Sequence, residues 1–455
     1  MDWDKQKAIL VAGAGISGTN ALDLILRTGY RPILYDGNPQ VDLEKIYTKL
    51  GRRDFEVCLG ELTDAVISRI QFCVMSPGIP LNRPFVDQLR RAGVPLISEI
   101  SLAYHFAKGK TGVVTGTNGK TTTTTLIGHI MEAFNPKTFT VGNIGRPYSE
   151  HVLKTEEDSL TVIEMSSFQM ETTEDMAPDF LVITNIRADH LDRHGSMEAY
   201  VELKKKLCRH QSPEQFVVYN GDDPWLQDIP GMTRARTLCF SSQRELEEGC
   251  FLRGQDIILR EDGEEHLICA TDQIQLLGMH NYENIMTGIV TARALGAPVS
   301  LIRRQVLSFT AVPHRMEFVC SHKGIQFYND SKATNPDSVV KAMEVVTPPV
   351  VLIAGGHDRR ADYREMVESF RGKVRSVVLL GATAQDIAHC IQQVHPLPIT
   401  HVRNMEEAVR TAYEQAREGD TVLLSPACAS WDMYPNFEVR GEEFKRLAKE
   451  IQSED

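Results

Sequence analysis

The sequence lacks a long apolar run, a paired cysteine motif and an excess of basic residues. No apolar stretch approaches the roughly 20 residues that a membrane helix needs, and the acidic start of the chain, Met1 to Lys5, does not resemble a signal peptide. The formal charge of -12 at pH 7 argues against a nucleic acid bound mainly through its phosphates. These absences predict a cytoplasmic protein whose partners include neither a membrane nor a nucleic acid.

The nine cysteines form no recognisable pattern. They are scattered, their number is odd, and no two make a C-x-x-C pair. This usage fits reduced thiols better than a disulfide framework or a zinc site. The length of 455 residues, 42% of them hydrophobic and 24% charged, is typical of a globular protein with two to four domains.

One glycine-rich stretch, Thr115 to Thr122, follows an apolar β-branched run and precedes a predicted helix. Glycines let backbone N–H groups approach phosphate oxygens, and the helix N-terminus adds partial positive charge. Lys120 is predicted to reach the outer phosphates and the Thr121 hydroxyl to bind Mg²⁺. Val114 stands where the strict G-x-x-x-x-G-K-[ST] loop has glycine, which excludes the commonest kinase and GTPase loops. We interpret the stretch as an ATP site rather than as a glycine turn before an ordinary helix.

A second glycine turn, from Gly13 to Gly18, lies near the start of the chain. It follows a predicted strand at residues 7–12 and precedes a predicted helix at 19–28; the next strand ends at Asp36. This G-x-G-x-x-G pattern, with an acid about twenty residues on, is usually taken as NAD-binding. Its chemistry suits any nucleoside diphosphate, including UDP. Further βα units, with strands at 72–75 and 94–97, complete a first domain that ends near residue 100.

In the middle of the chain, polar side chains follow two predicted strands, at residues 160–163 and 180–185. Glu164 follows the first strand, and His190 lies in the polar cluster after the second. Ligands of open α/β sheets bind beyond the carboxyl ends of the strands. We therefore expect Glu164 and His190 on the same side of one sheet as the phosphate loop.

The composition shifts again near residue 312, where a third α/β domain is predicted. Its strands, at residues 325–328, 350–354, 376–380 and 421–424, each end at a polar turn. Strand–helix alternation of this kind indicates a doubly wound parallel sheet. The predicted fold class is α/β with three domains. These are a Rossmann-like N-terminal domain at 1–100, a central P-loop ATPase-type parallel-sheet domain at 101–311 and a Rossmann-like C-terminal domain at 312–455.

Five motifs occur in order along the chain: the phosphate loop, Glu164 to Gln169, Asp189 to Asp192, Pro313 to Arg315, and Asn329 to Asn335. This ordered set, over nearly the whole chain, resembles the Mur ligase family, which builds the peptide stem of the bacterial cell-wall precursor. The resemblance implies an ATP-dependent carboxylate–amine ligase that works through an acyl phosphate. The motif at 329–335, the turn at 425–430 and the run Asn436-Phe437-Glu438 are similar to the member that adds D-glutamate to UDP-N-acetylmuramoyl-L-alanine.

The resemblance also implies a role for each candidate residue. The catalytic residues would be Lys120, Glu164, His190, Lys204 and Lys332. ATP would be bound by Gly116, Thr117, Asn118, Gly119, Lys120, Thr121, Thr122, Asn281, Asn284, Arg315 and Asp330. Two Mg²⁺ ions would be held, one by Thr121 and Glu164 and the other by His190 and Lys204, the lysine carbamylated by CO₂.

For the substrates, the first domain becomes a UDP site and the third an amino-acid site. The UDP substrate would be bound by Gly15, Ile16, Ser17, Asp36, Ser76, Pro77, Gly78, Asn143 and His190. D-glutamate would be bound by Thr334, Arg359, Ser430, Trp431 and Phe437. The partners implied are small molecules only, and the enzyme is expected to be a monomer.

Alternatives to these residue roles stay open from the residues themselves. Without the resemblance, Lys204 would be a solvated charge beside Lys205 and Lys206. Asn281 and Asn284 could cap a helix. Arg360 competes with Arg359, and His194, which has no matched role, is interpreted as a surface histidine.

Three rival functions also remain. The first is another Mur-type or folylpolyglutamate-type ligase with a different amino acid. The second is an NAD-dependent dehydrogenase with an incidental ATP loop, although no residues for nicotinamide chemistry stand elsewhere in the chain. The third is a nucleotide-binding module without catalysis.

Overall fold

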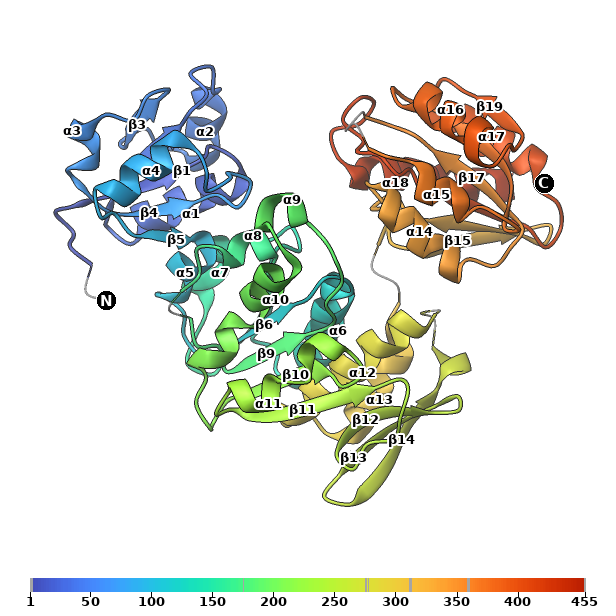
Figure 1. Ribbon diagram of the computed structural model, residues 1–455, viewed down its shortest axis with the longest axis horizontal. Helices are drawn as coiled ribbons and strands as arrows, with labels where there is room; N and C mark the ends of the chain where they lie inside the picture. Colours follow the sequence, from blue (N-terminus) through green and yellow to red (C-terminus); the bar gives the residue numbers. More distant parts are fainter. Residues whose placement is uncertain are drawn as a thin grey trace. The chain divides into compact units, whose positions relative to one another are not determined.

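The computed structural model describes residues 3–174, 176–274, 276, 278–310, 313–357 and 361–453. They form two compact units: Met1–Ile274 with Met279–Phe309, and Gln275–Gly278 with Thr310–Asp455. The described chain contains sheets of five, nine and six strands, the first two in the first unit (Figure 1). The predicted α/β class with three sheet-containing domains is confirmed, whereas the domain limits at 100 and 311 stay predictions.

The first sheet is parallel throughout, in the order β3-β2-β1-β4-β5. The helix predicted at 19–28 begins earlier, at Ile16, because the glycine turn is tight enough for the chain to be helical from that residue. A side chain at Gly18 would collide with the carbonyl oxygen of Gly13, so only glycine fits there. The strands are β1 (Ala8–Ala12), β2 (Arg31–Asp36), β3 (Glu56–Leu59), β4 (Ile70–Met75) and β5 (Leu96–Ser98); the helices are α1 (Ile16–Arg27), α2 (Leu43–Leu50), α3 (Asp64–Ile67), α4 (Pro84–Arg91) and α5 (Glu99–Tyr104).

The second sheet has the order β14-β13-β12-β11-β10-β9-β6-β8-β7. From β7 to β12 neighbouring strands are parallel, and β13 and β14 extend the sheet in antiparallel fashion. Because β6 lies between β8 and β9, the chain segments that follow these two strands flank the phosphate loop. The strands are β6 (Lys110–Thr115), β7 (Thr138–Gly142), β8 (Leu160–Glu164), β9 (Phe180–Ile183), β10 (Phe216–Asn220), β11 (Arg236–Ser241), β12 (Gly249–Arg253), β13 (Asp256–Glu261) and β14 (Glu264–Ala270).

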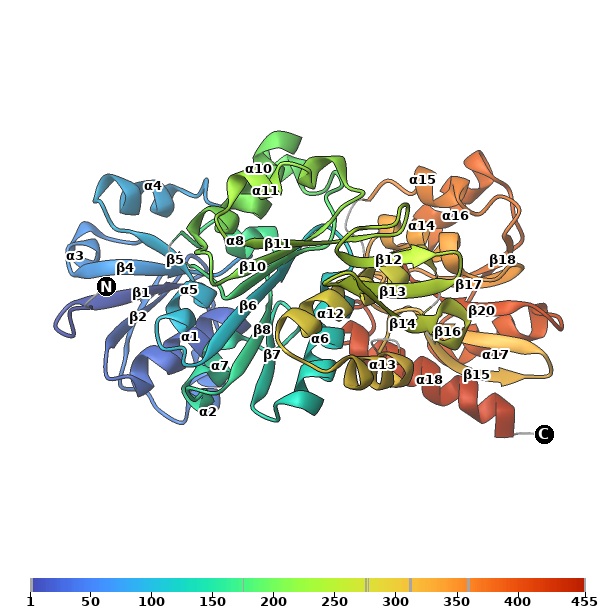
Figure 2. The same ribbon diagram turned by 90° about the horizontal axis from the view of Figure 1, so that it is seen from below.

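Helices cover both faces of this second sheet (Figure 2). The longest are α6 (Lys120–Phe134) and α12 (Met279–Ala294), which pack on each other. The others are α7 (Tyr148–His151), α8 (Ser167–Met170), α9 (Leu191–His194), α10 (Met197–Lys205), α11 (Ile229–Met232) and α13 (Val299–Ser308), with 3₁₀ turns η1 (Val152–Lys154), η2 (Lys206–His210), η3 (Pro224–Leu226) and η4 (Thr271–Gln273).

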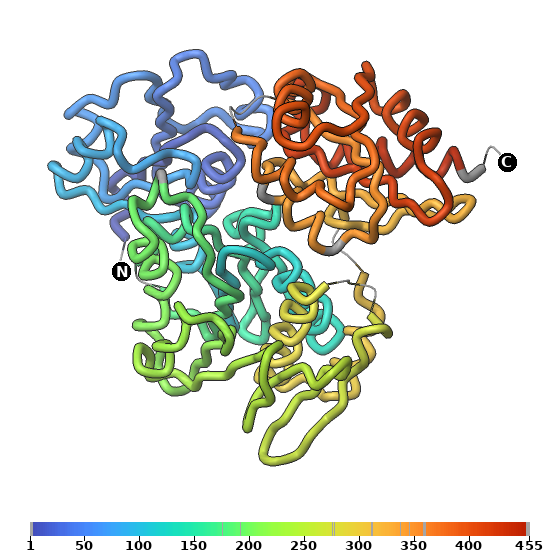
Figure 3. The backbone as a smooth tube through the Cα atoms, turned by 45° about the vertical axis from the view of Figure 1, so that its right-hand side comes forward, coloured from blue at the N-terminus to red at the C-terminus, as the bar shows by residue number. Residues whose placement is uncertain are grey.

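The first and second sheets share one hydrophobic core, which joins Ile9 and Leu24 to Ile163 and Leu181. The chain can be followed from the first sheet into the second in Figure 3. The backbone N–H of Ser98 donates to the carbonyl of Thr172 at 2.8 Å. The first unit is therefore continuous through both sheets.

The second unit contains the third sheet, in the order β15-β16-β20-β17-β18-β19. All four predicted strands are present, and two were not expected: β15, an antiparallel edge strand, and the three-residue β19. Helices α14 to α16 cover one face, and α17 and α18 cover the other (Figure 2). The strands are β15 (Glu317–His322), β16 (Ile325–Asn329), β17 (Val350–Ala354), β18 (Val374–Leu379), β19 (Ile399–His401) and β20 (Thr421–Leu424); the helices are α14 (Pro336–Val345), α15 (Arg364–Glu368), α16 (Ala384–Val394), α17 (Met405–Gln415) and α18 (Phe437–Ser453).

Every helix in the described part of the chain is too short or too polar to cross a bilayer.

Candidate active site

The phosphate loop has the predicted order of strand, glycine turn and helix, with β6 ending at Thr115 and α6 beginning at Lys120. Gly116 and Gly119 have φ values of 131° and 80°, which favour glycine. The Lys120 Nζ atom folds back and donates hydrogen bonds to the carbonyls of Gly116, at 3.1 Å, and Thr117, at 2.7 Å. The loop is thus held in one shape, with the amine of Lys120 over it.

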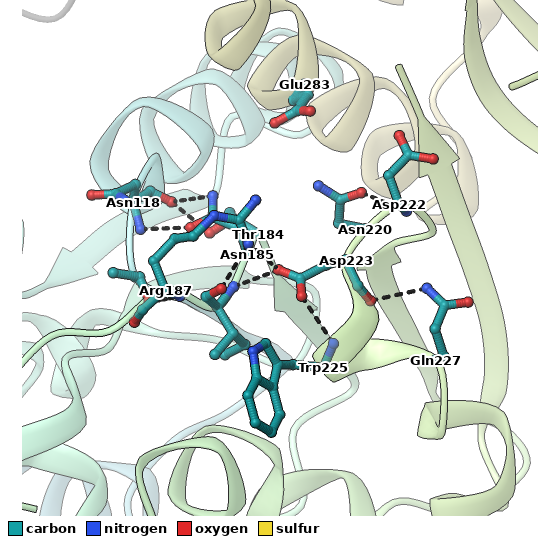
Figure 4. A network of polar contacts seen from close by, with 12 residues as sticks. Asn118, Thr184, Asn185, Arg187, Asn220, Asp222, Asp223, Trp225, Gln227 and Glu283 are labelled. Atoms are coloured by element: carbon teal, nitrogen blue, oxygen red, sulfur yellow. Dashed lines mark hydrogen bonds and ion pairs between the residues drawn. The ribbon is translucent and has the colours of Figure 1, made fainter. Parts of the chain in front are cut away.

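Chain segment 184–187, which follows β9, holds the loop from its side (Figure 4). The backbone N–H groups of Thr117 and Asn118 donate to Asn185, at 2.8 Å to its carbonyl and 3.0 Å to its Oδ1 atom. The Thr184 hydroxyl donates to the Asn118 carbonyl at 2.6 Å. A side chain at Gly116 would collide with this hydroxyl, so glycine is required for close approach as well as for its φ value.

Lys204 is buried, with 1% of its surface exposed, so the interpretation as a solvated charge is wrong. Its Nζ atom donates to the Thr115 hydroxyl at 3.2 Å, and none of the described carboxylates forms an ion pair with it. Burial, and then the positive charge of Lys120, holds the pKa of Lys204 well below its ordinary value. Helical periodicity explains why Lys204 is buried rather than solvated, because it lies one turn after the buried Tyr200 on α10.

Glu164 ends β8 and is also buried, with 1% of its surface exposed. Its Oε1 atom accepts a hydrogen bond from the Asn143 side chain at 3.0 Å. Its Oε2 atom is buried without a hydrogen-bond partner among the described residues. Because a buried carboxylate oxygen needs a partner, Glu164 and the nearly buried Thr121 suit a hard cation. No three His, Cys, Asp or Glu side chains gather for a metal in the described ranges, so other oxygen ligands, such as a hydroxyl group and water, would complete the coordination of such a cation.

His190 is the N-cap residue just before α9 and has a φ of 53°, an uncommon value for a residue with a side chain. Its ring lies 4.7 Å from the ring of Phe168, measured between centroids. Its Nε2 atom is 3.6 Å from an oxygen of Asp189, and its side chain is half-exposed. An exposed imidazole on the phosphate-loop side of the sheet is available to a ligand.

His194 is not a surface histidine, because only 5% of its side chain is exposed. Its Nε2 atom lies 3.1 Å from the Ser167 hydroxyl and its Nδ1 atom 3.4 Å from Glu171. Burial lowers its pKa. The single turn of α9 places His194 and Arg193 on the side that faces α8, which the sequence alone did not reveal.

Arg193 and Glu171 are further residues that sequence reasoning missed. The Arg193 guanidinium donates two hydrogen bonds to the Glu171 carboxylate, at 2.9 and 2.6 Å, and one to the carbonyl of Ile79 at 3.3 Å. It also lies 4.0 Å from the centroid of the Phe168 ring, which packs on His190. Arg193 thus links the turn after β4 to the chain segment around His190. In the sequence, the only indication of its importance was its position in the same polar cluster as His190.

The first glycine turn is braced by Asp36. Its Oδ2 atom accepts from the backbone N–H of Ala14 and its Oδ1 atom from that of Asn38, both at 2.9 Å. The Ser76 hydroxyl, in the turn after β4, is buried without a hydrogen-bond partner among the described residues. Ile16 is 70% exposed, and the space around Gly15 is open. The start of α1 is therefore accessible to a ligand.

Asn284 packs directly on the phosphate loop, and a side chain at Gly119 would collide with it. It is buried within α12, where its Oδ1 atom accepts from the Thr123 hydroxyl and its Nδ2 atom donates to Asn281, both at 3.3 Å. Helix capping is thus excluded for Asn284, because it lies inside the helix and its amide binds other side chains.

In the second unit, Asp330 is buried and accepts a hydrogen bond from the Ser425 hydroxyl at 2.8 Å. Burial raises its pKa to about 6, and the charge of Arg315 acts in the opposite direction. Lys332 lies 5.7 Å from the ring centroid of Phe437, so the structure brings these two candidates together.

The other candidates for D-glutamate lie on neighbouring turns of the same unit. Thr334 is in the loop before α14, and Ser430 is buried. Trp431 is 62% exposed and its ring lies 5.9 Å from that of His357. Arg359 and its competitor Arg360 lie outside the described residues. Arg440, which sequence reasoning missed, is buried on α18.

Arg440 joins two turns of the second unit. Its guanidinium donates to the hydroxyl and carbonyl of Ser331, at 2.9 and 2.8 Å, and to the carbonyl of Cys428 at 3.1 Å. In the sequence, the only indication that Arg440 matters was its proximity to the run Asn436-Phe437-Glu438.

Comparison with known proteins matches three family models to this chain. They describe the Mur ligase MurD-like N-terminal domain at residues 7–98, the Mur ligase middle domain at 114–292 and the Mur ligase glutamate ligase domain at 314–428. Two similar proteins, each named UDP-N-acetylmuramoylalanine–D-glutamate ligase, come from Lachnoclostridium phytofermentans and Lachnospira eligens. They are 44% and 42% identical, and each alignment covers 98% of this chain and 99% of the relative.

Solved structures with the same fold are also Mur ligases. The UDP-N-acetylmuramate-alanine ligase MurC of Thermotoga maritima superposes with a TM-score of 0.61 at 17% identity, over 99% of this chain and 100% of that one. The MurF ligase of the same organism, in complex with ADP, gives 0.58 at 16% identity, over 98% and 95%. This chain belongs to the Mur ligase family.

Proposed function

We propose that this chain is an ATP-dependent ligase that joins D-glutamate to UDP-N-acetylmuramoyl-L-alanine in the synthesis of the peptidoglycan precursor. The observation that carries the proposal is the 44% identity, across 98% of the chain, with a protein named for this activity. A carboxylate is a poor electrophile, so ATP first phosphorylates it. The amine of D-glutamate then attacks the acyl phosphate, forming an amide and releasing phosphate. Such a reaction depends on positioning and on charge neutralisation.

ATP is the phosphoryl donor and binds at the phosphate loop. Residues 116–122 hold its phosphates, and Lys120 turns from the two loop carbonyls toward the outer phosphates. Asn281 and Asn284 contact the adenine side. In the second unit, Arg315 contacts a phosphate, Asp330 the ribose and Lys332 the γ-phosphate. The glycine conformations and the buried Asn284 against the loop support this assignment.

The residues around the phosphate loop fit two Mg²⁺ ions. Thr121 and Glu164 would hold the first, which the unpartnered Oε2 atom of Glu164 supports. His190 and the carbamate of Lys204 would hold the second. When bound, Mg²⁺ neutralises the negative charge of the phosphates.

Carbamylation of Lys204 suits its surroundings. A lowered pKa leaves more of the amine neutral, and only a neutral amine can add to CO₂, forming an N–C bond and releasing a proton. The product is a buried anion that the positive charge of Lys120 favours, while the carboxylates of Asp189 and Glu164 act in the opposite direction. The hydrogen bond of Lys204 to Thr115 and the effect of the positive charge of Lys120 on its pKa support this step.

The remaining candidates bind the two other substrates. The turn at 15–17, Asp36, and the turn at 76–78 hold the UDP moiety, which the accessible α1 N-terminus and the unpartnered Ser76 hydroxyl support. Asn143 and His190 contact the muramoyl-alanine part. D-glutamate is held by Thr334, Arg359, Ser430, Trp431 and Phe437. The enzyme acts as a cytoplasmic monomer on these small molecules.

The amino-acid specificity of ATP hydrolysis tests the proposal. The purified protein, Mg²⁺, ATP and UDP-N-acetylmuramoyl-L-alanine are incubated with D-glutamate, L-alanine or meso-diaminopimelate, and ADP and product mass are measured. We expect ADP and a new amide with D-glutamate only. Turnover with another amino acid alone would assign a different ligase, and tight NADH binding without ADP release would favour a dehydrogenase.

A further inference from the structure

Asp223, between β10 and η3, has a side chain that is 0% exposed, yet it lies outside every role given above. Its Oδ2 atom accepts from the backbone N–H of Ile186 at 2.7 Å and from the Arg187 guanidinium at 3.0 Å. Its Oδ1 atom accepts from the backbone N–H of Trp225 at 3.0 Å. Burying a carboxylate is costly unless it is hydrogen-bonded, so these bonds fix the position of segment 184–187 (Figure 4).

The same segment fixes the phosphate loop. Besides the bonds from Thr184 and Asn185 to residues 117 and 118, the backbone N–H of Arg187 donates to the Thr117 hydroxyl at 2.9 Å. Two successive sets of hydrogen bonds therefore connect the Asp223 carboxylate to the loop, one from Asp223 to segment 184–187 and one from that segment to residues 117 and 118. Among the described residues the Asp223 side chain makes no hydrogen bond to the loop itself, so any influence on the loop passes through residues 184–187.

We propose that Asp223 is a positioning residue for ATP, which acts through segment 184–187 to hold Thr117 and Asn118 in the conformation that receives the phosphates. This inference rests on the proposed function in one respect, that the ligand of the loop is ATP. Loss of the carboxylate releases the segment, so nucleotide must order the loop as it binds, and affinity falls because that ordering opposes binding.

The preceding residue supplies a matched control. Asp222 also has a carboxylate with several hydrogen bonds, at 2.6 Å from the Ser241 hydroxyl and 2.7 Å from the backbone N–H of Ser242. Its partners lie at the end of β11 and just after it, and they do not include the segment at 184–187. Asp222→Asn thus removes a charge from the same turn without loosening the segment.

The experiment compares Asp223→Asn, Asp222→Asn and the unchanged enzyme in KM for ATP, KM for the UDP substrate, kcat and melting temperature. We expect Asp223→Asn to raise KM for ATP roughly tenfold, with less than about a twofold change in KM for the UDP substrate. Asp222→Asn should leave KM for ATP within about twofold. An unchanged KM for ATP in Asp223→Asn, or an equal rise in both variants, would overturn the inference even if Asp223→Asn melts at a lower temperature.

Amide hydrogen exchange without nucleotide separates this inference from the proposed function. We expect faster exchange at residues 115–122 in Asp223→Asn and unchanged exchange there in Asp222→Asn; equal exchange in the two variants would contradict the inference. An inactive wild-type enzyme would reject the function while leaving this readout intact. If Asp223→Asn does not fold, it is replaced by Thr184→Val, which removes the hydrogen bond to Asn118 at nearly constant volume, and the same readouts are measured. An unchanged KM for ATP in Thr184→Val would overturn the inferred connection through segment 184–187.

Discussion

Two strand–glycine turn–helix units lie in the first compact unit, and they are braced in different ways. The first, at Gly13 to Gly18, is braced by the carboxylate of Asp36, and the space at Gly15 is open. The second, at residues 116–119, is held by segment 184–187 and by the buried Asn284. Only the second carries a lysine, Lys120, at the start of its helix, and the buried Lys204 bonds to Thr115 at the end of its strand.

The difference shows that a glycine pattern alone indicates an anion site but not its chemistry. Glycine permits backbone N–H groups to approach a phosphate in either unit. Holding a diphosphate requires no more than that and a helix end. Transferring a phosphoryl group also requires fixed cations, which Lys120 and the surroundings of Glu164 and Lys204 can provide. We expect the first turn to govern substrate binding and the second to govern catalysis.

The largest expected effect is that of Lys120→Ala. Without the amine that now bonds to the Gly116 and Thr117 carbonyls, the transferred phosphoryl group loses its fixed cation. ADP release should fall roughly a thousandfold or more. Lys110→Ala, at the exposed start of β6, is the control and should keep nearly full activity. If Lys120→Ala retained a tenth of the activity, the loop would not be the site of transfer.

Lys204→Ala should come next, with a loss of roughly a hundredfold or more in kcat. The carbamate that we propose there disappears with the amine. Carbon-13 NMR in labelled bicarbonate should show a carbamate signal in the unchanged enzyme and in Lys206→Ala, whose lysine pairs with Glu174, but not in Lys204→Ala. Active enzyme without that signal would rule out the carbamate.

Much of this fold followed from the sequence, because buried parallel strands such as 160–163 and 350–354 are short apolar runs that end at polar turns. The edge strands were missed: β15 and β19 are partly exposed and lack that pattern. Burial of Lys204 was hidden because the three consecutive lysines look alike in sequence. In the structure Lys204 and Lys205 are both buried, and Lys206 is partly exposed. The contacts of Asp223, Arg193 and Arg440 could not be predicted, since each side chain bonds to residues distant in the chain.

A smaller effect is expected from Asp36→Ala at the first turn. The substitution removes the acceptor that fixes the Ala14 N–H and, on our proposal, a contact with the UDP moiety. KM for the UDP substrate should rise about tenfold, with KM for ATP unchanged. Steady-state kinetics with each substrate varied in turn would measure both. A rise in KM for ATP alone would reverse our assignment of the two turns.

The smallest effect should be that of Gly15→Ala. Because the added methyl group meets no atom, the free energy of unfolding should change by less than about 0.5 kcal/mol. KM for the UDP substrate should nevertheless rise a few fold, since the methyl group lies where a diphosphate would approach the backbone. Denaturant unfolding and kinetics test the two parts separately.

Gly18→Ala is the matched contrast to Gly15→Ala. Its methyl group would collide with the Gly13 carbonyl, so unfolding should become easier by roughly 1–3 kcal/mol. Equal stability of the two variants would show that the first turn is not as tightly built as its geometry indicates.

The central claim is that ATP activates a carboxylate as an acyl phosphate at this site, and oxygen transfer tests it most directly. UDP-N-acetylmuramoyl-L-alanine labelled with ¹⁸O in its carboxylate is converted with ATP and D-glutamate, and the released phosphate is examined by mass spectrometry. We predict one labelled oxygen in each phosphate, because the carboxylate oxygen that attacks the γ-phosphorus leaves with it when the amide forms. Amide formation with unlabelled phosphate would contradict the account.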